Sequence, residues 1–95
     1  MLKIEVKTLN GLTQDYLLYS NYYYLNIGNK KNLLSLYNVL HDFICGRFKN
    51  SSPLFKVNFN DKFLYIRNMT TNKVLGVNKS EVSALVQLIE AELTK

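Results

Sequence analysis

Residues 26–44 read NIGNKKNLLSLYNVLHDFI, residues 75–93 read LGVNKSEVSALVQLIEAEL, and the two segments align position for position. Identical residues stand at Asn29/Asn78, Lys30/Lys79 and Leu36/Leu85. Apolar residues with three- and four-residue spacing also coincide, at Leu33/Val82, Leu36/Leu85, Tyr37/Val86, Leu40/Ile89 and Ile44/Leu93. This spacing is typical of one face of a helix. The alignment predicts that one unit, made of strands followed by a helix, occurs twice in the chain.

Both helices are predicted to begin after an Asn-Lys break. The first is expected over residues 30–45, with Asn29 as its N-cap and Gly46 in the left-handed closing conformation. The second follows Asn78, and Glu81 stands three residues further on. That spacing predicts a capping box at the start of the second helix.

Strand patterns occupy most of the remaining sequence. Residues 2–7 alternate between apolar and charged, Asn10-Gly11 supplies a turn, and the aromatic residues 16–27 break near Ser20-Asn21. Further strands are expected at residues 54–59, 62–69 and 73–77. We therefore predict an α+β fold in which one antiparallel sheet is covered by two helices. The single domain of residues 1–95 would contain pseudo-repeat halves 1–48 and 53–95, joined by a connector at 49–52.

The clearest hairpin in the sequence is the one around Asn60-Asp61. A two-residue turn there would place Phe55 opposite Ile66 and Val57 opposite Leu64 on a core face. The opposite face would carry polar, basic and aromatic side chains, namely Lys56, Asn58, Phe63, Tyr65 and Arg67. Tyr22 and Tyr24 are expected on the same side of their own strand.

Aromatic rings bordered by positive charge suit single-stranded nucleic acid, because unpaired bases stack on the rings while cations meet the phosphates. The same pattern is also found on sheet faces that carry Tyr and Lys in solvent or that pack on a partner protein. Both interpretations follow from the sequence.

Charge and length limit the classes of protein further. The chain has 95 residues and a net charge of +5, and residues 49–79 contain six basic residues against Asp61 alone. A basic surface favours polyanions. A chain of this size buries only part of its surface, so we expect a homodimer.

The sequence has neither a signal peptide nor a long apolar run, and the protein is expected in the cytoplasm and away from membranes. Its Asn, Lys and Tyr richness suggests an AT-rich genome such as that of a low-GC bacterium, a phage or a mobile element.

Two further groups of residues are candidate sites. Lys30 and Lys31 at the start of the first helix, with Lys79 at the start of the second, could flank the phosphates of one strand of nucleic acid. His41 and Cys45 lie four residues apart on the first helix, but no second Cys or His exists to complete a metal site. We expect no catalysis, no metal and no cofactor.

Residues 55–93 resemble the single-stranded DNA-binding domain of the positive cofactor four family and the related Whirly proteins. The resemblance is carried by the strand KFLYIRNM, a short turn, and KVLGVNKSEVSALVQLIEAEL. It implies a curved antiparallel sheet that holds single-stranded DNA. By resemblance, the DNA face would include Lys56, Phe63, Tyr65, Arg67, Lys73 and Lys79. The chain lacks the family's lysine and glycine run before the last strand and has a second helix, so the Whirly-like arrangement is the closer comparison.

The sequence thus predicts a non-catalytic protein that binds single-stranded DNA or RNA without sequence specificity. The alternative is a small protein interaction module, such as a phage or mobile-element factor that binds a host protein through its tyrosine-rich strands.

Overall fold

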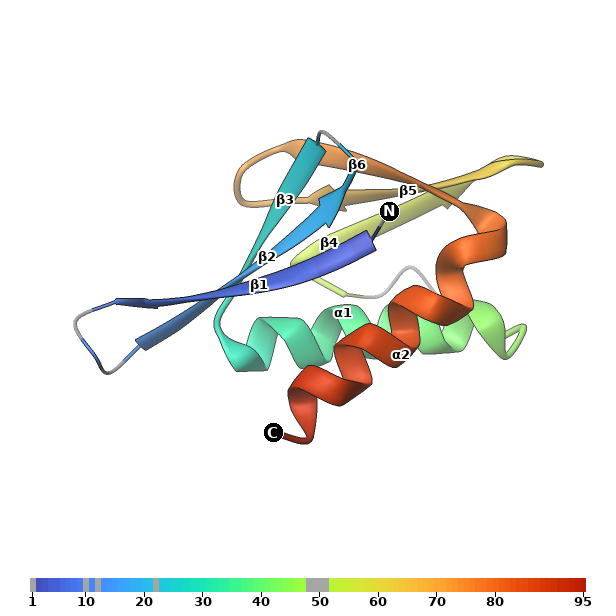
Figure 1. Ribbon diagram of the computed structural model, residues 1–95. Helices are drawn as coiled ribbons and strands as arrows, with labels where there is room; N and C mark the ends of the chain where they lie inside the picture. The colour runs from blue at the N-terminus through green and yellow to red at the C-terminus, as the bar shows by residue number, and fades with distance from the viewer. Residues whose placement is uncertain (1, 10, 12, 22, 48–51) are drawn as a thin grey trace.

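Two units of the same design, each with three strands followed by a helix, make up the protein (Figure 1). The computed structural model describes residues 2–9, 11, 13–21, 23–47 and 52–95. The first unit consists of β1 (Leu2–Leu9), β2 (Thr13–Ser20), β3 (Tyr23–Gly28) and α1 (Lys30–Ile44). The second consists of β4 (Phe55–Phe59), β5 (Phe63–Asn68), β6 (Lys73–Asn78), the 3-10 turn η1 (Lys79–Glu81) and α2 (Val82–Leu93). The predicted connector at 49–52 lies outside the described residues except for Ser52.

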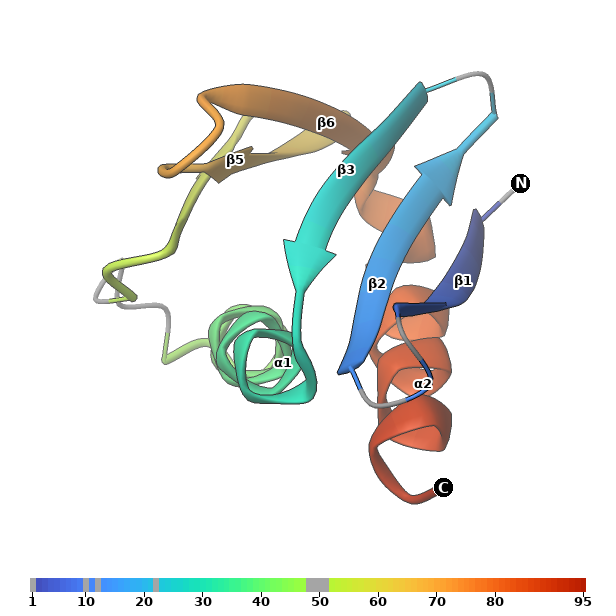
Figure 2. The same ribbon diagram turned by 90° about the vertical axis from the view of Figure 1, so that its left-hand side faces the viewer.

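The α+β fold class with antiparallel strands and two helices is confirmed, but the strands form two sheets where one was expected. Sheet A has the order β1-β2-β3 and sheet B the order β4-β5-β6. The edge strands β3 and β6 meet at a crossing angle too steep for a continuous ladder (Figures 1 and 2). Side chains bridge the sheets there: Ser20 Oγ donates to the Gly76 carbonyl at 3.4 Å, and Asn68 Nδ2 donates to the Asn26 carbonyl at 2.6 Å.

The core lies between the two sheets and the two helices, which pack against each other beneath them (Figures 1 and 2). Each sheet contributes alternate residues to it, since side chains on a strand point to opposite faces in turn. The buried strand residues of the core are Tyr16, Leu18, Leu25, Ile27, Phe55, Val57, Leu64, Ile66, Leu75 and Val77. One face of each sheet is therefore committed to the helices, and the other faces outward.

Helix α1 begins as predicted and ends one residue early, at Ile44. The Asn29 side chain accepts a hydrogen bond from the Asn32 amide at 2.9 Å, and Gly46 closes the helix with φ +74°. The prediction that Ile44 belongs to the core is wrong, because its side chain is exposed, whereas Val39 is buried. Val39 belongs to the core cluster, and α1 packs against α2 and against strands β2, β3 and β4.

The start of the second helix differs from the prediction. Residues 79–81 form a 3-10 turn before α2, and the Asn78 side chain makes no capping hydrogen bond to the backbone. Instead, Asn78 Nδ2 donates to Glu81 Oε1 at 2.9 Å, so the two side chains satisfy each other and the predicted capping box is absent. The predicted apolar face of α2 is confirmed, with Val82, Leu85, Val86 and Ile89 buried.

The β4–β5 hairpin has the predicted faces and a different register. Val57 lies opposite Ile66, and Phe59 opposite Leu64, so the turn sits one residue further along than predicted. The cause is Asn60, whose Oδ1 accepts hydrogen bonds from the amides of Lys62 and Phe63 at 2.9 and 2.8 Å. Asn60 therefore opens the turn, and Asp61 and Lys62 occupy its tip.

Asn68 is the one buried polar side chain among the described residues, and it organises the β5–β6 turn. Its Oδ1 accepts from the amides of Thr70 and Thr71 at 2.8 and 3.3 Å, while its Nδ2 reaches the Asn26 carbonyl of sheet A. One amide group thus closes a turn of sheet B and joins that turn to sheet A.

Substituting Asn68→Ala should destabilise the protein by about 2–3 kcal/mol, since it removes three hydrogen bonds and leaves buried partners unsatisfied. Chemical denaturation followed by circular dichroism measures this loss. Asn58→Ala, at an exposed position of the neighbouring strand, is the matched control and should change the free energy of unfolding by less than about 0.5 kcal/mol. Equal effects of the two substitutions would contradict the bridging role of Asn68.

Neither α1 nor α2 has the length and apolar character that a membrane-spanning helix needs, and no other described helix does.

Candidate nucleic-acid interface

The outward face of sheet B carries the side chains that the sequence singled out. All five predicted residues are exposed and alternate with buried core residues: Lys56, Asn58, Phe63, Tyr65 and Arg67. The observed register places Lys56 opposite Arg67, and Asn58 opposite Tyr65. The predicted grouping of these side chains on one face is therefore present, in the shifted register of the β4–β5 hairpin.

Phe63 and Tyr65 form an aromatic platform on this face. Their ring centroids lie 6.2 Å apart, and each side chain is a little more than a third exposed. Gly76 lies opposite Tyr65 on β6, and a Cβ at that position would stand 3.3 Å from Tyr65 Cε1. The absence of a side chain at Gly76 lets the Tyr65 ring lie over the neighbouring strand, with its other face toward solvent.

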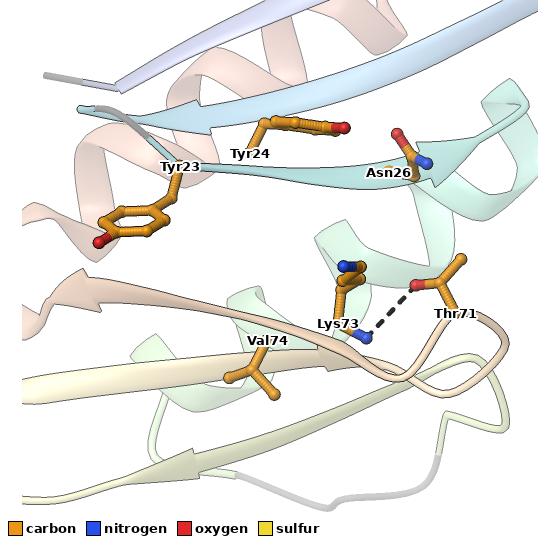
Figure 3. A pocket seen from close by; sticks show the side chains of 6 residues that line it. All are labelled: Tyr23, Tyr24, Asn26, Thr71, Lys73 and Val74. Atoms are coloured by element: carbon orange, nitrogen blue, oxygen red, sulfur yellow. Dashed lines mark hydrogen bonds between the residues drawn. The ribbon is translucent and has the colours of Figure 1, made fainter.

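A hollow lies at the crossing of the two sheets (Figure 3). It has a volume of about 340 Å³ and is lined by Tyr23, Tyr24, Asn26, Thr71, Lys73 and Val74. The first three side chains come from β3, and the others from β6 and the turn before it. Tyr23 is 72% exposed and points from β3 toward β6, as Figure 3 shows.

Two further hollows continue from this one along the outer surface. The second is lined by Ser20, Asn21, Tyr23, Phe63, Tyr65 and Gly76, and the third by Asn60, Asp61, Lys62, Phe63 and Tyr65. Tyr23 belongs to the first and second hollows, while Phe63 and Tyr65 belong to the second and third. The three hollows thus follow one another, and we call them together the aromatic groove.

Positive charge predominates around the aromatic groove. Lys62 and Lys73 line it, Lys56 and Arg67 lie beside the platform, and Asp61 is the one acidic residue of its lining. Lys56 and Arg67 face each other directly across two strands, a like-charge pair that disfavours the unliganded sheet. Within the described chain, the salt bridges are Lys3–Glu5 and Glu92–Lys95, and neither lies on sheet B. An anion on this face would relieve that repulsion.

Of the predicted lysines at the helix starts, Lys30 and Lys31 lie away from this groove. Lys79 adjoins its lining, since the Lys79 amide donates to the Lys62 carbonyl at 2.9 Å, but its side chain lies on the helix side of sheet B. Lys30 Nζ donates to the Lys95 carbonyl at 3.2 Å, and Lys79 Nζ lies 5.0 Å from the Phe59 ring centroid. Phe59 packs against Phe43 of α1, on the helix side of sheet B. Helices α1 and α2 begin at opposite ends of the molecule in Figure 1, so Lys30 and Lys31 cannot flank one short strand together with Lys79.

The remaining predicted positions are placed as follows. Tyr24 is exposed on the outer face of β3, where its ring centroid lies 5.7 Å from that of Tyr19. Tyr22 lies outside the described residues. His41 and Cys45 share a face of α1, with 3.7 Å between Nδ1 and Sγ. No group of three potential metal ligands occurs in the described part of the chain.

Sequence reasoning missed Tyr23, Thr71 and Gly76 as parts of the groove. Tyr23 has the strand parity of the buried Leu25, but it stands at the first position of β3, beyond the cover of the helices. Thr71 lies in the β5–β6 turn, where the strand alternation of side chains does not apply and cannot predict which way its side chain points. A signal existed only for Gly76, because a glycine within a strand often marks a close approach of another group.

Comparisons of the chain with protein-family models, with curated proteins and with solved structures found no match. What the groove can do must therefore be argued from its own residues.

Replacing Phe63 or Tyr65 with Ala should leave the protein folded, because both rings lie on the solvent side of sheet B. We expect a loss of stability of about 1 kcal/mol or less for each. The comparison variant is Ile66→Ala, whose fully buried side chain should cost about 2–5 kcal/mol. Thermal unfolding of the three variants checks this order, and a collapse of the Tyr65→Ala protein would show that the platform is part of the core.

Proposed function

We propose that this protein binds single-stranded nucleic acid along the aromatic groove and has no catalytic activity. The observation that supports this most strongly is the row of three connected hollows, with Lys62 and Lys73 in their lining. Tyr23 lines the first and second hollows, and Phe63 and Tyr65 line the second and third. The rings follow one another along the groove and a lysine lies at each end, Lys73 in the first hollow and Lys62 in the third. A flexible polyanion with stacking bases fits such a surface.

The aromatic platform favours a single strand over a duplex. Phe63 and Tyr65 present ring surface on an exposed sheet face, and only bases that are free of a stack can lie against it. Stacking on a ring contributes roughly 1–3 kcal/mol per base and is available to every base. Binding should therefore be largely independent of sequence.

The surrounding charges supply the complementary contacts to phosphate. The opposed Lys56 and Arg67 have no acidic partner in the described salt bridges, and a phosphate between them would turn a repulsive pair into an attractive one. Arg67 Nη1 is 3.4 Å from Asn72 Oδ1, a contact that orients the guanidinium near the β5–β6 turn.

Labelled single-stranded and duplex oligonucleotides of equal length, titrated with the protein at two salt concentrations, test the proposal by fluorescence anisotropy. We expect preference for the single strand and a steep loss of affinity with salt, since bound phosphates release counterions. Tight binding that ignores salt, or no binding at low salt, would contradict it. Salt-insensitive capture of a protein through the tyrosines would then be the function to pursue.

Variants distinguish binding through the aromatic groove from binding through the net positive charge of the protein. Tyr65→Ala should weaken single-strand binding by roughly 1–3 kcal/mol at every salt concentration, because it removes a stacking surface. Arg67→Ala should lower the salt-dependence slope by about 1. Lys31→Ala removes the same charge at an exposed position far from the groove and is the matched control. Equal losses for Arg67→Ala and Lys31→Ala would show that binding follows net charge alone.

A further inference from the structure

Strand β1 is an open edge of sheet A. It pairs with β2 along all eight of its residues, and no strand borders its other side in the described part of the chain. Its remaining backbone amides and carbonyls are a template for another strand. Natural edge strands are usually protected by proline, bulges or repeated lysines. Here β1 contains no proline, and Glu5 stands between its two lysines.

The side chains of β1 complement a second copy of the same strand. In an antiparallel pair centred on Ile4, Lys3 lies opposite the partner's Glu5, and Leu2 lies opposite the partner's Val6. Opposite residues share a face, so the charges would meet on one side and the apolar residues on the other. A register shifted to centre on Glu5 would instead set Glu5 against the partner's Glu5. The sequence of β1 therefore favours the register centred on Ile4 over the register centred on Glu5.

An apolar hollow beside β1 would receive the partner strand. It lies between Leu2 and the outer side of α2, and its volume is about 500 Å³. Ala84, Leu88 and Ala91 form its apolar lining, and Glu81 and Gln87 lie at it as well. Val6 is 36% exposed. The end of the β1–β2 hairpin extends past the helices (Figure 1). In the register centred on Ile4, the partner's Val6 falls beside Leu2, on the helix side of the sheet. The exposed Val6 side chain of the partner would thus lie at the hollow between Leu2 and α2.

The geometry points to a homodimer in which β1 pairs antiparallel with β1 of a second copy about Ile4, extending sheet A to six strands. The Lys3–Glu5 contact of 3.9 Å within one chain would become part of an alternating cluster of four charges. The aromatic groove stays open in this dimer, because it borders β3 at the opposite edge of sheet A. The dimer and the proposed function are therefore independent of each other.

Sedimentation or light scattering of the full chain tests the dimer. The wild type should have twice the monomer mass at roughly 100 μM. Lys3→Glu should raise the dimer dissociation constant at least about tenfold, because two attractive pairs become repulsive. The double variant Lys3→Glu/Glu5→Lys should restore the dimer. Lys7→Gln removes a charge on the same face that has no charged side chain opposite it across the dimer in this register. It is the control and should remain dimeric; a neutral residue is chosen because Asp15 lies opposite Lys7 within the chain.

Two outcomes would overturn the inference. One is a wild type that remains monomeric at this concentration. The other is a dimer that survives Lys3→Glu or is lost in Lys7→Gln, which would place the interface or its register elsewhere. Circular dichroism of each variant shows whether the chain is folded, and Leu88→Glu gives a second probe, since it should break the dimer from the α2 side of the hollow.

Discussion

The rest of the structure depends on the packing of one face of each sheet against the two helices. Two helices that pack on each other can cover the inner faces of two three-stranded sheets, and the core residues Leu64, Ile66 and Leu75 show how completely this is done, being buried to 2% exposure or less. Because side chains on a strand alternate between its two faces, the burial of one residue sends its neighbours in sequence to the outer face. Phe63, Tyr65 and Arg67 have to face outward because their neighbours in sequence face the helices.

The crossing of the two sheets converts this outward face into a groove. Because β3 and β6 meet at an angle, their side chains leave a hollow at the contact in place of a continuous ladder. The Asn68 amide maintains that contact by closing the β5–β6 turn and holding the Asn26 carbonyl. The position of Lys73 in the groove thus rests on a buried side chain that does not itself reach the ligand surface.

Sequence reasoning predicted the parts of this arrangement that depend on periodicity. The repeated helical pattern identified both helices, and alternation in residues 54–69 assigned the two faces of the hairpin correctly. It failed where a single side chain competes with a general rule: Asn60 moved the turn by one residue, and Glu81 bonded to Asn78 in place of the backbone. The division into two sheets and the exposure of Tyr23 arise from the angle between distant strands, which no local pattern contains.

Amide chemical shifts of the isotope-labelled protein, followed by NMR while a short single-stranded oligothymidylate is added, test the central claim most directly. The account predicts that the perturbed residues gather along β3, β5, β6 and the β5–β6 turn, with Tyr23, Tyr65, Gly76 and Lys73 among them. Perturbations confined to the start of α1 around Lys30 and Lys31, or spread evenly over all lysines, would contradict it, because the ligand would then follow charge and ignore the groove.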